Sequence, residues 1–139
     1  MKFQISGFYY GTIELLLVNI LYAMAIVILG RIMFGMYFVI SGISHFKDRK
    51  TLTGYADSKK VPMAHLSVLV TGVMLLVGGL GFVLNVSLPQ SAVLLLLFLI
   101  PTSFIMHAFW KDSDPMHKMN NKINFMKNLA LAGALLMFI

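Results

Sequence analysis

Four long apolar runs, separated by short polar and charged stretches, dominate this sequence. They extend over about Tyr22–Phe46, Val61–Leu84, Ser91–Trp110 and Ile123–Ile139. A helix needs about 20 apolar residues to cross the hydrocarbon core; the first three runs reach this length, and the fourth is marginal. None alternates like a barrel strand, and only helices or closed barrels satisfy their backbone hydrogen bonds in lipid. The pattern therefore predicts an all-α, membrane-embedded four-helix bundle formed by residues 22–139.

The first 21 residues form a leading segment that this pattern does not explain. The stretch from Thr12 to Phe46 is too long for one straight crossing, and no turn signal divides it. We favour an interfacial helix, with Phe8, Tyr9 and Tyr10 at headgroup depth, that leads into the first span. An extended, tilted first helix is the alternative. Because Glu14 interrupts the apolar stretch and no small-residue cleavage site follows, we expect the segment to be retained.

Composition points to the same class of protein. Of the 139 residues, 59% are hydrophobic and only 12% are charged, whereas soluble domains carry about 25% charged residues. With so few charged residues, the protein could not shield its apolar side chains from water. The lipid bilayer is therefore an expected partner. The sequence contains no cysteine, which excludes disulfides, thiol nucleophiles and cysteine-ligated metals within it.

The net charge of +6 is concentrated at alternate junctions between the runs. The basic residues are Lys47, Arg49, Lys50, Lys59 and Lys60 at the first junction, and Lys111, Lys118 and Lys122 at the third. Residues 85–90, at the second junction, include none. The positive-inside rule therefore places both basic loops in the cytoplasm and both chain ends opposite. Charge placed in this way indicates topology, so no nucleic-acid partner is expected.

Glycines recur at a spacing of seven residues in the first two runs. Gly35 and Gly42 form one pair, and Gly72 and Gly79 form the other. Seven residues are about two helical turns, so each pair lies on one helix face. Small residues let helices approach closely in lipid, which predicts helix-packing positions. The alternative is that glycine is simply frequent in membrane helices.

Arg31 is a basic residue near the middle of the first run. It lies about 14 Å from the start of the run at ~1.5 Å per residue. An arginine at that depth costs at least about 2.5 kcal/mol, so it should face the bundle and hold a partner. Glu14 could be that ion-pair partner only if the chain bends, because a continuous helix would separate the two by about 25 Å. Alternatively, Arg31 snorkels to the outer surface.

A second set of polar residues lies where the runs meet the basic junctions. His45 ends the first run, His65 opens the second, His107 and Trp110 end the third, and Lys127 with Asn128 opens the fourth. Together with Arg31 they are candidates for a ligand or proton-exchange pocket, because imidazole titrates near neutrality and Lys and Asn can hold a carbonyl or an anion. The alternative is that they are ordinary interfacial residues. No metal is expected, because the spans offer no carboxylate beside these histidines.

Several motifs occur in an order that resembles the DoxX family of small four-helix integral membrane proteins. They are Gly30-Arg31 with Gly35, Ser41-Gly42-Ile43-Ser44-His45-Phe46, Val61-Pro62 with Gly72 and Gly78-Gly79, His107-Ala108-Phe109-Trp110, and Asn124-Phe125-Met126-Lys127-Asn128-Leu129. The last two are the most specific, and the resemblance covers about Ala25 to the C-terminal residue. His45 is a departure, because many members carry a lysine at that position.

The resemblance implies a prokaryotic plasma membrane and an association with quinol oxidase or thiosulfate:quinone oxidoreductase activity. It suggests a redox-associated subunit whose polar pocket, lined by Arg31, His107, Lys127 and Asn128, takes a quinone or a lipid-like ligand. No motif in the sequence binds a cofactor by itself. A redox partner subunit or a second copy is the expected protein partner. The alternative is a non-enzymatic assembly, scaffold or chaperone subunit that binds another membrane protein, and the sequence leaves open whether any reaction is catalysed.

Overall fold

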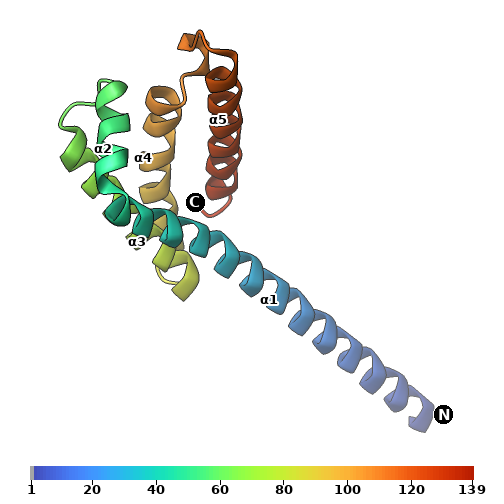
Figure 1. Cartoon of the computed structure of the whole chain (residues 1–139). Coiled ribbons are helices and arrows are strands. Elements are labelled where there is room, and N and C mark those ends of the chain that lie inside the picture. The colour runs from blue at the N-terminus through green and yellow to red at the C-terminus, as the bar shows by residue number, and fades with distance from the viewer. Residues whose placement is uncertain (1) are drawn as a thin grey trace.

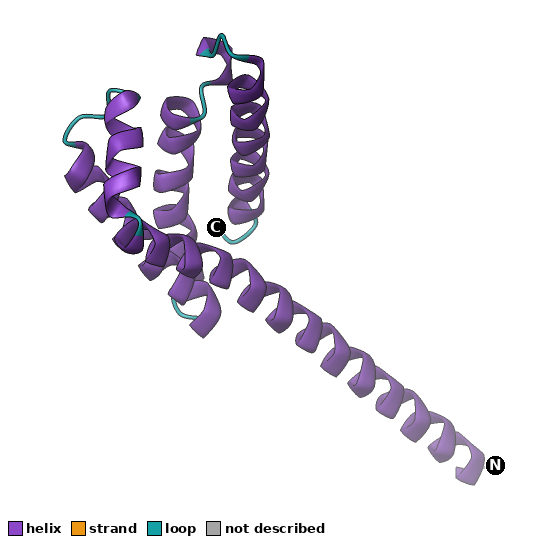
Figure 2. Ribbon diagram, in the orientation of Figure 1, coloured by secondary structure: helices purple, strands orange, loops and turns teal. Residues whose placement is uncertain are grey.

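The protein is entirely helical in the part that the structure, a computed structural model, describes: the backbone of residues 2–139 and the side chains of residues 13–139 (Figure 2). The helices in chain order are α1 (Lys2–Lys47), α2 (Arg49–Ser58), α3 (Ala64–Leu84), α4 (Leu88–Met106), the 3-10 turn η1 (Phe109–Lys111) and α5 (Pro115–Leu136). The prediction of an all-α protein is confirmed.

Helix α1 is one uninterrupted helix of 46 residues, about 69 Å long at ~1.5 Å per residue. Of the two arrangements considered for the N-terminal segment, the structure therefore has the extended first helix, because a separate interfacial helix would need a bend that α1 lacks. Its first half extends away from the other helices (Figure 1). The headgroup depth of Phe8, Tyr9 and Tyr10 stays a prediction, since their side chains lie outside the described part.

Three segments of the described chain are long and apolar enough to cross a membrane. They are Ile13–Lys47 in α1, Ala64–Leu84 in α3 and Leu88–Lys111, which comprises α4 and η1. The prediction of a multi-pass membrane protein is thereby confirmed. Helix α5 starts with a polar stretch and is not among them, so a fourth crossing stays a prediction. It lies antiparallel beside α4 and completes the bundle (Figure 1).

The core is built by the helix faces that point inward from α1, α3, α4 and α5. Its fully buried large side chains are Phe38, Leu75, Phe82, Leu95, Leu99 and Leu135. Phe34 meets Phe38 and Phe82 edge-on, with ring centroids 5.2 Å apart in both pairs. Edge-to-face aromatic pairs add to the stabilisation that burial alone provides. The core therefore fixes α1 against α3 over the second half of α1 only.

Glycines bring α1 and α3 into backbone contact. A Cβ atom at Gly35 would lie 2.7 Å from the carbonyl oxygen of Gly79, and one at Gly79 would lie 2.8 Å from that of Gly35. About two helical turns further along α1, a Cβ at Gly42 would lie 3.0 Å from the carbonyl oxygen of Gly72. Real Cβ atoms essentially never lie closer than 3.0 Å to another heavy atom, so the Gly35–Gly79 contact needs glycine on both helices, and the Gly42–Gly72 contact is tight. All four glycines singled out in the sequence lie at this contact.

Local sequence signals explain where the later helices begin and end. Helix α3 stops because Asn85 adopts the left-handed conformation (φ 59°), which asparagine tolerates better than most residues. Helix α5 starts after Asp114, whose carboxylate accepts the backbone N–H of His117 at 2.8 Å. Pro115 follows in the first turn, where its missing N–H has no consequence.

The first basic junction is not a plain loop, because it contains helix α2. Ala56 of α2 is buried against Ala64 and Val68 of α3, and Leu52 packs beside them. The exposed positions carry much of the basic charge, so α2 has its apolar side turned toward α3 and its charged side outward. Both basic junctions are at this end, since Lys59 Nζ lies 3.5 Å from a carboxylate oxygen of Asp112 in the other junction.

Single cysteines provide a direct test of the predicted topology, because the chain has none of its own. We expect a membrane-impermeant maleimide to label Gln90→Cys on intact cells, and to label Gly54→Cys and Ser113→Cys only after lysis. All three positions are exposed in the structure. Met137→Cys, beyond the end of α5, should be labelled from outside if α5 crosses. Labelling of Gly54→Cys on intact cells would contradict the orientation.

The glycine contact predicts that Gly79→Ala destabilises the protein. The added methyl group would press on the backbone of Gly35 and Val39, and overpacking of this kind costs about 1–3 kcal/mol. The measurement is the thermal unfolding midpoint in detergent. Gly133→Ala in α5, where a Cβ meets nothing within 4 Å, is the matched control and should be neutral or stabilising. Equal midpoints for both variants would contradict a tight contact.

Candidate functional site

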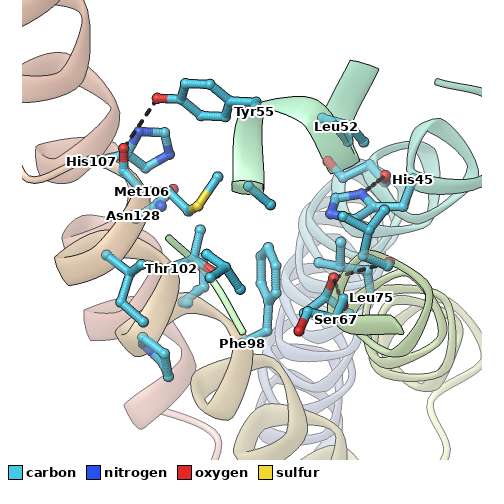
Figure 3. A pocket seen from close by; sticks show the side chains of 18 of the residues that line it. His45, Leu52, Tyr55, Ser67, Leu75, Phe98, Thr102, Met106, His107 and Asn128 are labelled. Carbon is cyan, nitrogen blue, oxygen red and sulfur yellow. Dashed lines mark hydrogen bonds between the residues drawn. The ribbon is translucent and has the colours of Figure 1, made fainter. Parts of the chain in front are cut away.

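A partly enclosed pocket of about 470 Å³ lies at the end of the bundle that α2 covers. All five α-helices contribute to its walls, as the close-up in Figure 3 shows for most of them. Most of the lining is apolar, including Phe38, Leu75, Phe98 and Leu99. A pocket of this size and character, with a small number of polar groups, is typical of sites for small apolar or amphiphilic molecules.

Four of the polar residues singled out in the sequence line this one pocket. They are His45 from α1, His107 from the end of α4, and Lys127 and Asn128 from α5. His45 and His107 lie on opposite sides of the space (Figure 3). Asn128 is only 6% exposed, while Lys127 is exposed and its ammonium donates to Asn124 Oδ1 at 3.1 Å. The pocket therefore gathers residues from three helices that lie far apart in the sequence.

Arg31 does not line the pocket. It precedes His45 by 14 residues on a continuous helix, which separates them by about 21 Å. Arg31 lies where α1 leaves the bundle: residues 13–30 are exposed, and the Nε atom of Arg31 is buried without a hydrogen-bond partner among the described residues. The ion pair with Glu14 required a bend between the two residues. Because α1 is continuous, Glu14 cannot reach Arg31 of the same chain.

His65 and Trp110 also lie outside the pocket. His65 is exposed in the first turn of α3. Trp110 is about half exposed and belongs to an aromatic cluster with Phe109 and Phe125, at centroid distances of 5.1 and 5.6 Å. This cluster fastens η1 to α5, so the structure gives Trp110 a packing contact and no contact with the pocket.

His45 is held in a defined orientation by its own helix. Its Nδ1 atom lies 2.8 Å from the carbonyl oxygen of Ser41, one turn earlier. Its ring meets Phe98 of α4 nearly perpendicularly, with centroids 6.0 Å apart, and its Cβ fits over Gly72, where a methyl group would lie 2.9 Å away. The glycine contact between α1 and α3 therefore also makes the space that His45 occupies.

A hydrogen-bond network around Asn121 fixes His107. The Nδ1 atom of His107 lies 3.2 Å from Asn121 Oδ1, and Asn121 Nδ2 donates to a carboxylate oxygen of Asp112 at 2.7 Å. Asn121 is 7% exposed. Asn121 was not predicted as a site residue from the sequence. One signal could have found it, since Asn121 precedes Asn128 by seven residues and so shares its face of α5.

The same network joins α2 to the opposite wall of the pocket. The hydroxyl of Tyr55 donates to the carbonyl oxygen of Met106 at 3.1 Å and lies 3.5 Å from Asn121 Oδ1. Lys59 adds the ion pair with Asp112, and its ammonium lies 5.7 Å from the centroid of the Tyr55 ring. Helix α2 is thus attached on one side by apolar packing on α3 and on the other by polar contacts.

The carboxyl group of Asp112, in the junction after η1, is the acid in this network. The hydrogen bond from Asn121 holds the pKa of Asp112 below its ordinary value of 3.8, and the nearby charge of Lys59 acts in the same direction. Asp112 therefore stays ionised at neutral pH and acts only as a hydrogen-bond acceptor. Among the residues that the structure describes, no group of three His, Cys, Asp or Glu side chains could hold a metal ion.

These features define a helical membrane protein with a mainly apolar pocket at one end of its bundle. The family model of DoxX matches residues 26–108 of the chain, which is more than half of it. The chain therefore belongs to the DoxX family. Neither a curated protein nor a solved structure matches it.

The matched region includes α2, α3, α4 and the bundle-forming half of α1. It ends at Ala108, so the motif that begins at His107 is only partly inside it. Helix α5, which brings Asn121, Lys127 and Asn128 to the site, lies beyond it. The two motifs judged most specific from the sequence are thus mostly outside the matched residues.

The network predicts that Asn121→Leu lowers stability by about 2 kcal/mol, because the partly buried partners of the amide, His107 and Asp112, lose their hydrogen bonds. Thermal unfolding in detergent at neutral pH measures this loss, and Asn120→Leu, at the exposed neighbouring position, is the matched control. A depressed carboxyl pKa contributes stability that is present at neutral pH and lost as the pH falls through that pKa. The deficit of the variant should therefore narrow below pH 3.8, the ordinary pKa of Asp112. A deficit that widens on acidification would contradict this account.

Proposed function

We propose that this DoxX-family protein is a redox-associated membrane subunit that binds a quinone or a lipid-like amphiphile in the pocket between its helices. The observation that carries the proposal is the convergence of His45, His107, Lys127 and Asn128 on one pocket of about 470 Å³. Sites for small molecules commonly have about 300–1,000 Å³, mostly apolar walls and a few polar groups that fix orientation.

The residues present fit the two parts of such a ligand. The aromatic and aliphatic walls, with Phe38, Phe98 and Leu75, provide the dry surface that a ring and the first part of an apolar tail require. The imidazoles and the side chains of Lys127 and Asn128 offer hydrogen bonds to head-group oxygens. A bound quinone supplies the electron and proton chemistry itself. The chain's own residues bind the head group, orient it and keep water away from it.

A different observation favours the second candidate, a scaffold or assembly subunit. Residues 13–30 of α1 form an exposed apolar helix that leaves the bundle, about 27 Å long at ~1.5 Å per residue. Another membrane protein or a second copy of this chain could pack along it, as small-residue and apolar helix faces do in lipid. This role would not use the pocket, so the two candidates differ in the part of the chain on which they depend.

We expect native mass spectrometry of the detergent-extracted protein to show a retained small amphiphile, and added quinone to raise the unfolding midpoint. Ligand at about a hundredfold excess over its Kd contributes ~2.7 kcal/mol, or a shift of several degrees. His107→Ala should reduce both effects. His65→Ala, at an exposed position outside the pocket, is the matched control and should retain them. A protein that carries no small molecule, gains no stability from quinone and is isolated with a partner chain would favour the scaffold role instead.

A further inference from the structure

A second, smaller pocket lies at the same end of the bundle, between the end of α2 and the junction that follows α4. Its volume is about 290 Å³. Its lining residues are Ser58, Lys59, Lys60, Ile105, Ala108, Lys111 and Asp112. Ile105 is the one residue that it shares with the larger pocket. The polar groups of the two pockets are therefore different.

The smaller pocket brings together lysines from both basic junctions. Lys59 and Lys60 come from the first junction and Lys111 from the third, so the lining carries three positive charges against the one negative charge of Asp112. Both oxygens of Asp112 are already engaged: one accepts from Asn121 Nδ2 at 2.7 Å, and the other lies 3.5 Å from Lys59 Nζ. A pocket lined by an excess of one charge attracts ligands of the opposite charge, here anions.

The end of α2 explains why two successive lysines reach this pocket. Helix α2 ends at Ser58, and the backbone N–H groups of Lys59 and Lys60 then donate to the carbonyl oxygens of Ala56 and Asp57 at 3.1 and 2.9 Å. Lys60 adopts the left-handed conformation (φ 58°), which stops the helix. The turn therefore leaves both side chains at the end of α2 that borders the pocket.

The three lysines differ in how firmly they are held. The ammonium of Lys59 is fixed at the wall, 3.5 Å from Asp112 and 5.7 Å from the centroid of the Tyr55 ring. Lys60 and Lys111 are exposed, and the structure shows no ion pair between them and other described residues. A lysine ammonium is a compact charge on a flexible four-carbon stem, so these two can adjust to an anion at the pocket mouth.

The pocket lies where an apolar segment ends. Lys111 is the last residue of Leu88–Lys111, a segment apolar enough to cross a membrane. Trp110 precedes it and is about half exposed, and tryptophan rings are enriched at the level of the lipid headgroups. Ile105, also exposed, belongs to the same apolar segment. The pocket therefore has basic groups on one side and lipid-facing apolar surface on the other.

We infer that this smaller pocket binds the phosphate group of an anionic phospholipid, whose acyl chains lie along the exposed surface of α4 beside Ile105. A volume of about 290 Å³ is at the lower end of the ~300–1,000 Å³ of small-molecule sites, which suits a headgroup while the chains stay in the bilayer. Ammonium groups form strong, charge-assisted hydrogen bonds to phosphate oxygens. The basic end is predicted to face the cytoplasm, and the cytoplasmic leaflet carries a negative surface potential. A free phosphate ion would use the lysines alone and leave the apolar side of the pocket without a role.

Trp110, the single tryptophan of the chain, reports on lipids at this site. The full-length protein is reconstituted in phosphatidylcholine vesicles that contain an increasing fraction of a phospholipid with brominated acyl chains, and the quenching of Trp110 gives the relative affinity of that lipid. We expect brominated phosphatidylglycerol to bind at least about tenfold more tightly than brominated phosphatidylcholine, since each lysine near the surface contributes about fivefold for anionic lipid. Equal affinities for the two lipids would overturn the inference.

Two double variants separate the pocket from the general charge of this end of the protein. Lys60→Gln combined with Lys111→Gln retains most of each stem but removes two of the charges that line the pocket, so the preference should fall to about twofold or less. Lys47→Gln combined with Lys50→Gln removes the same number of charges at exposed positions outside the pocket, and should retain the preference. Equal losses in the two double variants would overturn a specific site.

Inorganic phosphate distinguishes a lipid headgroup from a free anion. Added to the wild-type vesicles at constant ionic strength, it should leave the quenching by brominated phosphatidylglycerol unchanged, because it lacks the contact with the apolar surface at Ile105. Displacement of the brominated lipid by inorganic phosphate would overturn the lipid as the ligand. The larger pocket takes no part in these measurements, so their failure would leave the proposed function in place.

Discussion

The contact between α1 and α3 is the constraint on which the rest of the structure depends. Lipid offers no hydrophobic drive for two apolar helices to associate, so their pairing relies on close van der Waals packing. Gly35 and Gly79 permit it at one end of the crossing, and Gly42 and Gly72 permit it at the other. This contact places α1 beside α3, and the second half of α1 also packs on the aromatic core. It also creates the space over Gly72 in which His45 lies, so the packing of the bundle and one wall of the pocket have the same cause.

The pocket is organised by hydrogen bonds that link it to the basic end of the protein. Asn121 connects a pocket histidine to Asp112, and Asp112 pairs with Lys59 of α2. The helix that covers the pocket and the imidazole inside it are therefore parts of one network. Polar networks of this kind are rigid when every member is satisfied. The basic residues that indicate topology thus have a second role, because one of them, Lys59, links α2 to Asp112 beside the site.

Much of the architecture could be predicted from the sequence, because apolar length and charge placement follow directly from the properties of a bilayer. The polar residues near the basic junctions were recognisable for the same reason. What could not be predicted was which of these polar side chains meet in one pocket. His65 and His45 both lie at a junction, yet only His45 lines the pocket, since side-chain direction depends on helix rotation. Arg31 was grouped with the pocket because its depth in the membrane was estimated from its position in the apolar run alone. The sequence does not show at which residue α1 begins to contact the other helices. Asn121 escaped notice because its partners come from other segments: His107 and Asp112 from the junction before α5, and Tyr55 from α2, a helix in what was expected to be a loop.

The continuity of α1 has a mechanical consequence. The residues that meet α3 and the pocket, including His45, and the exposed residues 13–30 belong to one helix without a hinge. The glycine crossing is therefore the pivot of a lever whose free arm runs from Gly35 back to Ile13, about 33 Å at ~1.5 Å per residue. A rotation of about 10° there would displace Ile13 by roughly 6 Å, given the same helical rise. Whatever holds the free arm in the membrane would set the angle of α1, and through it the width of the pocket at its opposite end.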